Sequence, residues 1–535
     1  MPANDVNDFR AHHEAPCPSP PSPKGSAFWL SYTAILVATL LSALDVTAVS
    51  TTLPTITADL NGADTFVWVG SAYALSSTAI LPLSGSLANI FGRKPIMLIC
   101  IAFFALARTV QGIGGGGILN LTEIIISDLV PLAERGLYQG VFSLVWALAS
   151  GIGPPIVSHN DSSSWVLQSS TSYVSINAGR RARAKGLLEM VVLGNFIVVA
   201  GATLAISGLT FAGIRFPWSS AQVLAPLISG LVILVVFIVY EMKVPVEPTI
   251  PWEVLNNRAA LSGYLSTFAQ GIVGVTIIYY LPVYFQASMG ASPIRSGVEI
   301  LPTAMILSPF ALIAGVSVQI LGKYRLVNII GWVLLTVGLG VMSLLKADSS
   351  TGQWVGYQIL TAAGTGLLYA SVVFPILARQ TVENYAAALA FFAFVRSFSL
   401  TWGVTISSTV LQNELKKKLP AAFLSQFPDG LEIAYAAIPI IGDLQEPLRT
   451  EVRVAFAESM SVIWKTMIGI SALGFISLLF LQEIKMALHT DATYGLTVNE
   501  TSDMQDQEKA IHDGAAVVTV VPGGAVDIIS SDLES

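Results

Sequence analysis

The sequence predicts an all-α polytopic membrane protein, and three observations carry this prediction. The 535 residues are 53% hydrophobic and only 11% charged, whereas soluble domains contain about 25% charged residues. Apolar runs of about 18 residues or more, long enough to cross a bilayer as helices, recur along the chain. A single segment that crosses lipid must satisfy its own backbone hydrogen bonds, which only a helix does. This composition excludes a soluble enzyme.

One short loop predicts the sidedness of the chain. The stretch GSLANIFGRKP, from Gly85 to Pro95, separates two apolar runs. Its basic residues Arg93 and Lys94 place the loop in the cytoplasm, because short loops rich in Lys and Arg stay on that side. Two spans precede this loop, so the N-terminus is expected in the cytoplasm as well.

Both ends of the chain are predicted to be disordered cytoplasmic tails. Residues 1–26 are rich in Pro and Ser, and residues 483–535 are acidic and polar. Residues 27–482 between them form one membrane domain. The two cysteines, Cys17 and Cys100, fall in a tail and in a span, so neither a disulfide nor a metal site is expected.

The first half of the membrane domain contains an irregular segment. A first span at Ala27–Ser50 carries Asp45, and a second span runs from Phe66 to Leu83. Residues 96–129 are too few for two spans of about 20 residues each and a turn. We therefore expect them to form one long or broken helix. A further span follows at Leu137–Val157.

Residues 158–186 are predicted to be irregular and to lie outside the bilayer, in place of a span. They are Ser-rich, contain no long apolar run and end in a basic cluster of Arg180, Arg181, Arg183 and Lys185. Asn160 begins a glycosylation sequon, which favours the outer side, whereas the basic cluster favours the cytoplasm. No span separates these two conflicting signals, so the side remains open.

The rest of the domain alternates regularly between apolar runs and polar loops. Eight runs are expected near 187–211, 223–240, 259–285, 300–321, 326–345, 356–377, 386–411 and 461–481. Residues 412–460, between the last two runs, are expected to form a long outer loop. The total is about 12 spans, or 13 if residues 96–129 count as two.

The motifs resemble those of the major facilitator superfamily. The loop at Gly85–Pro95 resembles the G-x-L-A-x-x-x-G-R-K pattern that joins spans 2 and 3 in that superfamily, with Gly85, Gly92, Arg93 and Lys94 in place. The resemblance implies two helical bundles that rock about a central cavity. It also implies that this loop is a conformational switch, although an ordinary basic loop is the simpler alternative.

Three further motifs are most similar to the fungal fourteen-span drug:proton antiporters. LDVTAVSTTLPTI resembles the end of their span 1, and ARTVQGIGGGG resembles the start of their span 4. ASGIGPPIVS matches in part their span 5 motif, which marks the direction of transport, with Gly153 and Pro154 intact. A plain proline kink is the alternative. Against fourteen spans, the predicted 12–13 leave the N-terminal bundle incomplete.

The resemblance implies a secondary transporter that exports a hydrophobic small molecule, such as a drug, toxin or secondary metabolite, against proton entry. Aromatic side chains are the expected cavity lining, namely those of Trp146, Tyr279, Tyr280, Tyr284, Trp332 and Trp402. No enzymatic activity, cofactor, metal or nucleic-acid partner is expected. The protein is expected to be a monomer in the plasma membrane, with the vacuolar membrane as the alternative.

The coupling candidates are Asp45, Arg108 and Glu123. A charged group inside a span usually faces a cavity or a partner, because burial in lipid costs about 2.5–3.5 kcal/mol. Asp45 and Arg108 are expected at similar depth and can pair, either as a proton-coupling pair or as a static link. Glu123 is a relay candidate or a carboxylate at the inner interface. Arg396 lies inside a later span, and its partner cannot be predicted.

Two rival functions remain open. An uptake permease is disfavoured because the P-E-S-P-R motif of sugar porters is absent from the sequence. The other rival is a non-transporting paralogue or a flawed gene model, and it rests on the two short segments near 96–129 and 158–186. We expect the chain as written to transport poorly or not at all.

Overall fold

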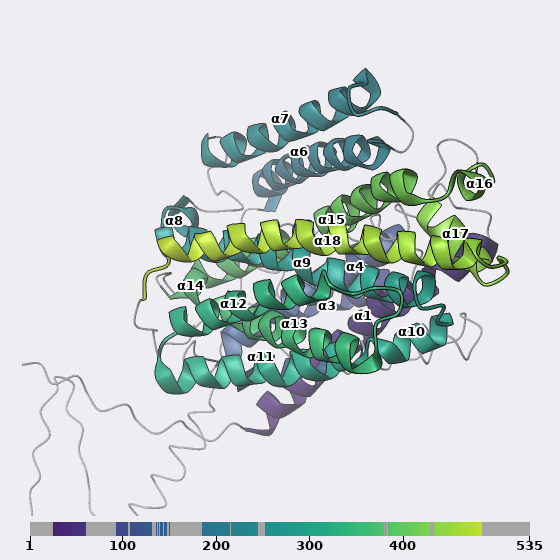
Figure 1. Ribbon diagram of the computed structural model, residues 1–535. Coiled ribbons are helices and arrows are strands. Elements are labelled where there is room, and N and C mark those ends of the chain that lie inside the picture. Colours follow the sequence, from purple (N-terminus) through teal and green to yellow (C-terminus); the bar gives the residue numbers. More distant parts are fainter. Residues whose placement is uncertain are drawn as a thin grey trace, which may run out of the picture. The chain divides into compact units, whose positions relative to one another are not determined.

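The computed structural model describes residues 25–59, 77, 93–104, 108–130, 184–213, 216–243, 252–378, 380, 384–427 and 433–483, with single positions between 135 and 149. All of these lie in one compact unit, residues 1–491. The described part is built almost entirely of helices (Figure 1). Both predicted tails lie outside the described residues, so their disorder remains a prediction.

Six long helices form the C-terminal half, and each overlaps a predicted span. Helix α9 is central, because it packs against both α15 and α18, while α13 lies between α11 and α12. A single apolar core joins them. The helices are α9 (Arg258–Ala287), α11 (Leu301–Leu321), α12 (Arg325–Met342), α13 (Thr351–Ser371), α15 (Tyr385–Lys418) and α18 (Leu448–Ser477).

Local sequence signals set the ends of these helices. Asn257 caps α9 by accepting a hydrogen bond from the backbone of Ala259. Ser350 and Gln353 form a capping box at the start of α13, which satisfies two backbone N–H groups that the first turn leaves free. Helix α11 ends at Gly322, whose φ of 64° suits glycine.

Short helices connect the long ones. They are α8 (Trp252–Leu255), α10 (Pro293–Glu299), α14 (Phe374–Leu377), α16 (Ala421–Leu424), α17 (Ile433–Ile441) and the 3-10 turn η2 (Leu478–Phe480). The segment 412–460 is therefore not a loop throughout. Its first residues are the end of α15, its last are the start of α18, and α16 and α17 lie between.

Helices α6 (Ala184–Phe211) and α7 (Ala221–Lys243) form a hairpin beside the C-terminal half (Figure 1). Their axes approach closely because Gly230 of α7 lies against the backbone of Ala205 of α6. Helix α15 holds the turn of the hairpin, since Lys416 Nζ donates to the Gly213 carbonyl at 2.7 Å. Most of α7 remains exposed, as expected for a lipid-facing helix.

The described N-terminal half consists of α1 (Ser26–Asp59), α3 (Arg93–Phe104), α4 (Arg108–Leu129) and positions between 135 and 149. Helices α1 and α4 share a small aromatic and aliphatic core. Tyr32 of this core donates to the Tyr138 carbonyl at 2.8 Å.

The expectation of one long or broken helix over residues 96–129 is wrong. Helices α3 and α4 are separate and pack side by side as an antiparallel hairpin, with Ile96 and Cys100 of α3 against Leu121 and Ile118 of α4. Close packing is possible because Gly117 leaves room for the Cys100 sulfur. The arms are unequal, and α3, with 12 residues, is too short to cross a bilayer alone.

Within the described residues, seven helices are long and apolar enough to cross a membrane, and three shorter apolar helices accompany them. The shorter ones are Phe28–Leu44, Gly114–Ile126 and Phe196–Phe211. The multi-pass helical fold is confirmed. Residues 158–183 lie outside the described residues, so their predicted irregular structure is not tested.

Two glycines of α12 provide a test of this packing. A Cβ atom at Gly338 would lie 2.7 Å from the Thr361 Cα of α13, whereas one at Gly340 would meet no atom within 4 Å. We expect Gly338→Ala to lose about 1–3 kcal/mol through overpacking and to melt at a lower temperature. Gly340→Ala, the matched control, should be neutral or more stable. Thermal size-exclusion profiles in detergent measure both, and equal profiles would contradict the described α12–α13 contact.

Candidate functional site

The candidate site is an ion pair that joins the two halves of the molecule. Helix α4 of the N-terminal half packs against α15 of the C-terminal half. Across this contact, Arg396 Nη1 lies 4.0 Å from Glu123 Oε1. The side chains of Arg396 and Glu123 are only 17% and 8% exposed, respectively. A buried pair of opposite charges therefore connects the halves.

Aromatic and carbonyl groups hold the Arg396 guanidinium in place. Its Nη2 donates to the Tyr369 carbonyl of α13 at 3.1 Å. The guanidinium carbon lies 3.9 Å from the centre of the Tyr369 ring and 5.1 Å from that of Phe392, one turn earlier on α15. Cation–π attraction to these two rings stabilises the charge in this apolar setting.

The Glu123–Arg396 pair can act as a switch, because the loss of one charge changes the free energy of the contact between the halves. Removing one member of a buried ion pair costs about 3–5 kcal/mol, because the other charge is left uncompensated. Protonation of the Glu123 carboxylate removes its negative charge and with it the attraction to Arg396. A proton can therefore change how firmly the two halves are joined.

Close backbone contacts accompany the ion pair. Ser397 of α15 donates to Ser77 of the N-terminal half at 3.4 Å. Ser77 is itself packed within that half, since a Cβ atom at Gly116 of α4 would lie 2.6 Å from its carbonyl oxygen. Elsewhere, a Cβ atom at Gly140 would lie 2.8 Å from the Cα of Leu312 in α11. The two halves therefore touch at Ser397 and Ser77 and pack closely at Gly140 and Leu312.

Comparison with known proteins decides the family. Residues 35–165 match the Major Facilitator Superfamily, and residues 164–460 match the fungal trichothecene efflux pump family. The chain belongs to the fungal efflux-pump branch of the major facilitator superfamily. The predicted fold class and the predicted class of secondary transporter are confirmed. The two matches meet inside the Ser-rich segment 158–186.

Named relatives of this major facilitator are efflux pumps. The chain is 34% identical to efflux pump FUS6 of Gibberella fujikuroi over 92% of this chain and 96% of that protein. It is 32% identical to the MFS-type efflux pump LUC4 of Fusarium sp, over 94% and 96%. The human organic anion transporter MFSD10 has the same fold, with a TM-score of 0.53 at 13% identity, covering 85% of this chain and all of that one.

The alignments with FUS6 and LUC4 include positions that this chain lacks. They run over 538 and 544 positions, more than the 535 residues of the whole chain. Both relatives therefore contain residues that have no counterpart in this major facilitator.

The structure places the predicted coupling residues unequally. Glu123 lies on α4 and forms the ion pair described above. Asp45 lies on α1, and Arg108 is the first residue of α4, but the side chains of both lie outside the described residues. Their pairing therefore remains a prediction.

The other predicted site residues lie mostly outside the described part of the chain. Arg93 and Lys94 form the first turn of α3, and their side chains are not described. Outside the described residues altogether lie Gly85, Gly92, Gly153, Pro154 and Asn160. The switch loop, the antiporter kink and the glycosylation site remain predictions.

The predicted aromatic cavity lining is wrong for three of its six members. Tyr280, Tyr284 and Trp332 are fully buried in the C-terminal core. Tyr280 donates to the Val404 carbonyl at 3.0 Å, and Trp332 Nε1 donates to Ser266 Oγ at 2.9 Å. These polar atoms join neighbouring helices, so the three residues stabilise the bundle and do not face a cavity.

Sequence reasoning missed the partner of Arg396. The available signal was an arginine inside an apolar run, which predicts that a partner exists without identifying it. Glu123 was identified as a candidate for a different reason, its position on α4. Only the packing of α4 on α15 brings the two together.

Proposed function

We propose that this major facilitator exports a hydrophobic small molecule in exchange for protons, and that proton binding at Glu123 releases the contact between its halves. The observation that carries this proposal is the buried Glu123–Arg396 pair, which bridges α4 and α15. A proton binds more tightly to the conformation in which the pair is broken, so it shifts the population toward that conformation. Alternating access then follows from the rocking of the two halves.

The comparisons support a lipophilic cargo. The matched family is described as a trichothecene efflux pump, and the relatives FUS6 and LUC4 are named efflux pumps. We propose a secondary metabolite or toxin of comparable apolar character as the substrate. The proposed setting is a monomer in the plasma membrane, with the vacuolar membrane as the alternative.

A second ion pair is proposed between α1 and α4, from Asp45 to Arg108. Both residues lie on membrane helices of the N-terminal half, where an unpaired charge is costly. Asp45 then takes part in proton binding together with Glu123. The Gly85–Lys94 loop and the Gly153–Pro154 kink are proposed to guide the motion between the two open states.

The test of this function is pH-gradient-driven transport in vesicles that contain either the full chain or a version with family-length spans. Asp45→Asn removes the charge while preserving the size of the side chain, and we expect it to reduce export of rhodamine 6G and of a trichothecene by at least about tenfold, because coupling needs an ionisable group. The amount of protein in the membrane should not change. Undiminished export by the variant would contradict the role of Asp45 in coupling.

The same assay separates the two rival functions. Movement of the probes opposite to the flow of protons, into the compartment that the protons leave, would identify an exchanger. Movement in the same direction as the protons would identify an uptake permease. No gradient-dependent movement, both by the chain and by a version with family-length spans, would identify a protein that does not transport these probes.

A further inference from the structure

One face of α15 carries a file of small polar side chains. Ser397, Thr401, Thr405, Ser408 and Gln412 lie within an arc of about 80° when successive residues are 100° apart, and all five are at least nine-tenths buried. The file is about 24 Å long at 1.5 Å per residue. We call these five residues the hydroxyl file.

Three members of the hydroxyl file have polar atoms without a partner. Thr401 Oγ1, Ser408 Oγ and Gln412 Nε2 are buried, and none of the three atoms makes a hydrogen bond within the described part of the chain. The other polar atom of Gln412, Oε1, accepts a hydrogen bond from the Ile433 backbone of α17 at 3.1 Å. The opposite face of α15, toward α9, differs. There Ser407 Oγ lies 2.8 Å from Thr276 Oγ1, and Ser399 donates to the Arg396 carbonyl at 2.6 Å.

Unpartnered buried polar groups require an explanation, since each has lost its hydrogen bonds to water without gaining others. Water satisfies such groups when several of them line one path. The hydroxyl file faces away from α9, the helix that covers the other side of α15. At the Ser397 end its exposure depends on how closely the N-terminal half approaches, because Ser397 contacts Ser77 there. The Gln412 end lies against α17.

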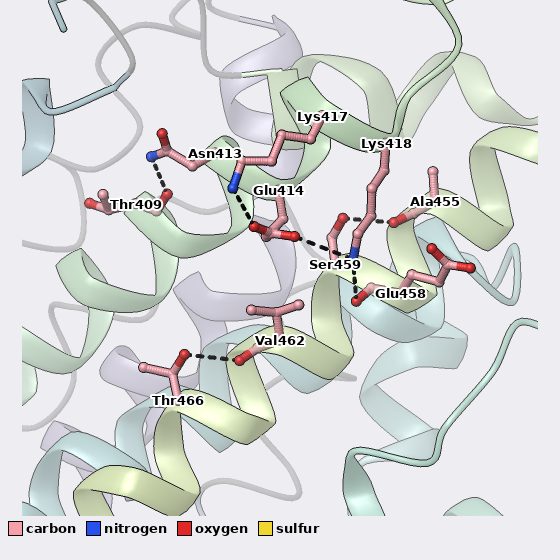
Figure 2. Close-up of polar contacts among 10 residues, drawn as sticks. All are labelled: Thr409, Asn413, Glu414, Lys417, Lys418, Ala455, Glu458, Ser459, Val462 and Thr466. Carbon is pink, nitrogen blue, oxygen red and sulfur yellow. Dashed lines mark hydrogen bonds and ion pairs between the residues drawn. The ribbon is translucent and has the colours of Figure 1, made fainter. Parts of the chain in front are cut away.

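A charged residue lies close to each end of the hydroxyl file in the sequence. At one end, Ser397 follows Arg396, the partner of Glu123. At the other end, Gln412 lies two residues before Glu414, whose carboxylate contacts Lys417 Nζ at 2.8 Å and Lys418 Nζ at 3.4 Å (Figure 2). Lys418 also reaches α18, where it donates to the Glu458 carbonyl at 3.0 Å.

We infer that the hydroxyl file is a water-lined proton path from the C-terminal end of α15 to Glu123. Water enters when the halves separate and hydrogen-bonds to Thr401, Ser408 and Gln412. A hydronium ion at the Ser397 end of the file gives its proton to the Glu123 carboxylate. The products are a neutral carboxylic acid and a water molecule. The role in proton delivery rests on the proposed function, whereas the presence of water does not.

Cysteine labelling of the full chain tests for water. In a background of Cys17→Ser and Cys100→Ala, Ser408→Cys is compared with Ser407→Cys, its neighbour that faces α9. A small hydrophilic methanethiosulfonate, supplied on both sides of the membrane, should modify Ser408→Cys at least about tenfold faster, since thiol reactivity follows exposure. Thr401→Cys is the second variant in case Ser408→Cys does not fold. Equal rates at both faces of α15 would overturn the inference.

Removal of the hydroxyls tests the proton role separately. The double variant Thr401→Val/Ser408→Ala should slow proton uptake after a pH jump by about tenfold, because the water file loses its polar contacts, while rhodamine 6G binding is unchanged. Ser399→Ala, on the opposite face, is the control. A double variant that takes up protons at the original rate would show that the file does not deliver protons. If labelling succeeds but Glu123→Gln does not alter coupling, the proposed function fails and the water path remains.

Discussion

Replacement of Glu123 by Gln is expected to abolish pH-gradient-driven export while leaving substrate binding intact. The amide has nearly the size of the carboxylate but cannot exchange a proton, so the contact with Arg396 no longer responds to pH. We expect export to fall by about 100-fold, as when an essential proton-transfer group is removed. The measurement is export from vesicles of controlled internal pH, made both with this chain and with a version that has family-length spans.

The stability of single and double variants distinguishes a coupling role of the Glu123–Arg396 pair from a purely structural role. Arg396→Gln leaves Glu123 buried without its charge partner, which should cost about 3–5 kcal/mol. The double variant Glu123→Gln/Arg396→Gln removes both charges, so we expect it to recover most of this stability but no transport. A double variant that regains proton-driven export would show that the pair is only a structural link.

A matched control is available on the surface. Glu446 Oε1 accepts a hydrogen bond from Arg449 Nε at 2.8 Å, and both side chains are well exposed. Glu446→Gln makes the same chemical change, but an exposed pair contributes little to stability because water screens its charges. We therefore expect normal export and a nearly unchanged melting temperature from this variant.

Restoring the short N-terminal segments is expected to raise export at least about tenfold, because functional groups displaced from their working positions can lose about 100-fold in rate. The variant replaces residues 96–190 by the corresponding stretch of FUS6, which has residues that this chain lacks. The physical reason is length, because α3 has only 12 residues, whereas a span needs about 20. Export from vesicles with equal amounts of both proteins measures the effect.

Two outcomes would contradict this prediction. Robust export by the unaltered chain, equal to that of the repaired one, would show that the missing segments are dispensable. A repaired chain that folds but remains inactive would place the defect elsewhere. The transcript across residues 96–190 shows independently whether the short segments are encoded or arise from a flawed gene model.

Most of the C-terminal half could be predicted from local sequence patterns. The runs expected at 259–285 and 326–345 became α9 and α12 with bounds shifted by three residues or fewer. Hydropathy and capping act over a few neighbouring residues, so they are visible without a fold. The segment 412–460 was less predictable, because its helices α16 and α17 are short and its ends continue α15 and α18.

The α3–α4 hairpin shows where local reasoning failed. A length argument treats each span as isolated, and by that argument residues 96–129 cannot form a full pair of spans. The glycines of α4 can form a packing surface, but no local pattern identifies the helix that covers it. Contact between Gly117 and Cys100 stabilises two unequal helices, an outcome that depends on their close approach and not on their lengths.

The sequence by itself determined that this protein is a helical membrane transporter, because apolar run length and the motif at Gly85–Lys94 are local properties. It also determined that Glu123 and Arg396 are unusual, since each is a charge inside an apolar run. Only the tertiary structure decided that they meet. Their helices lie far apart in the chain, and packing of α4 on α15 brings the two side chains to 4.0 Å. That contact depends on the arrangement of whole helices, which no local pattern encodes.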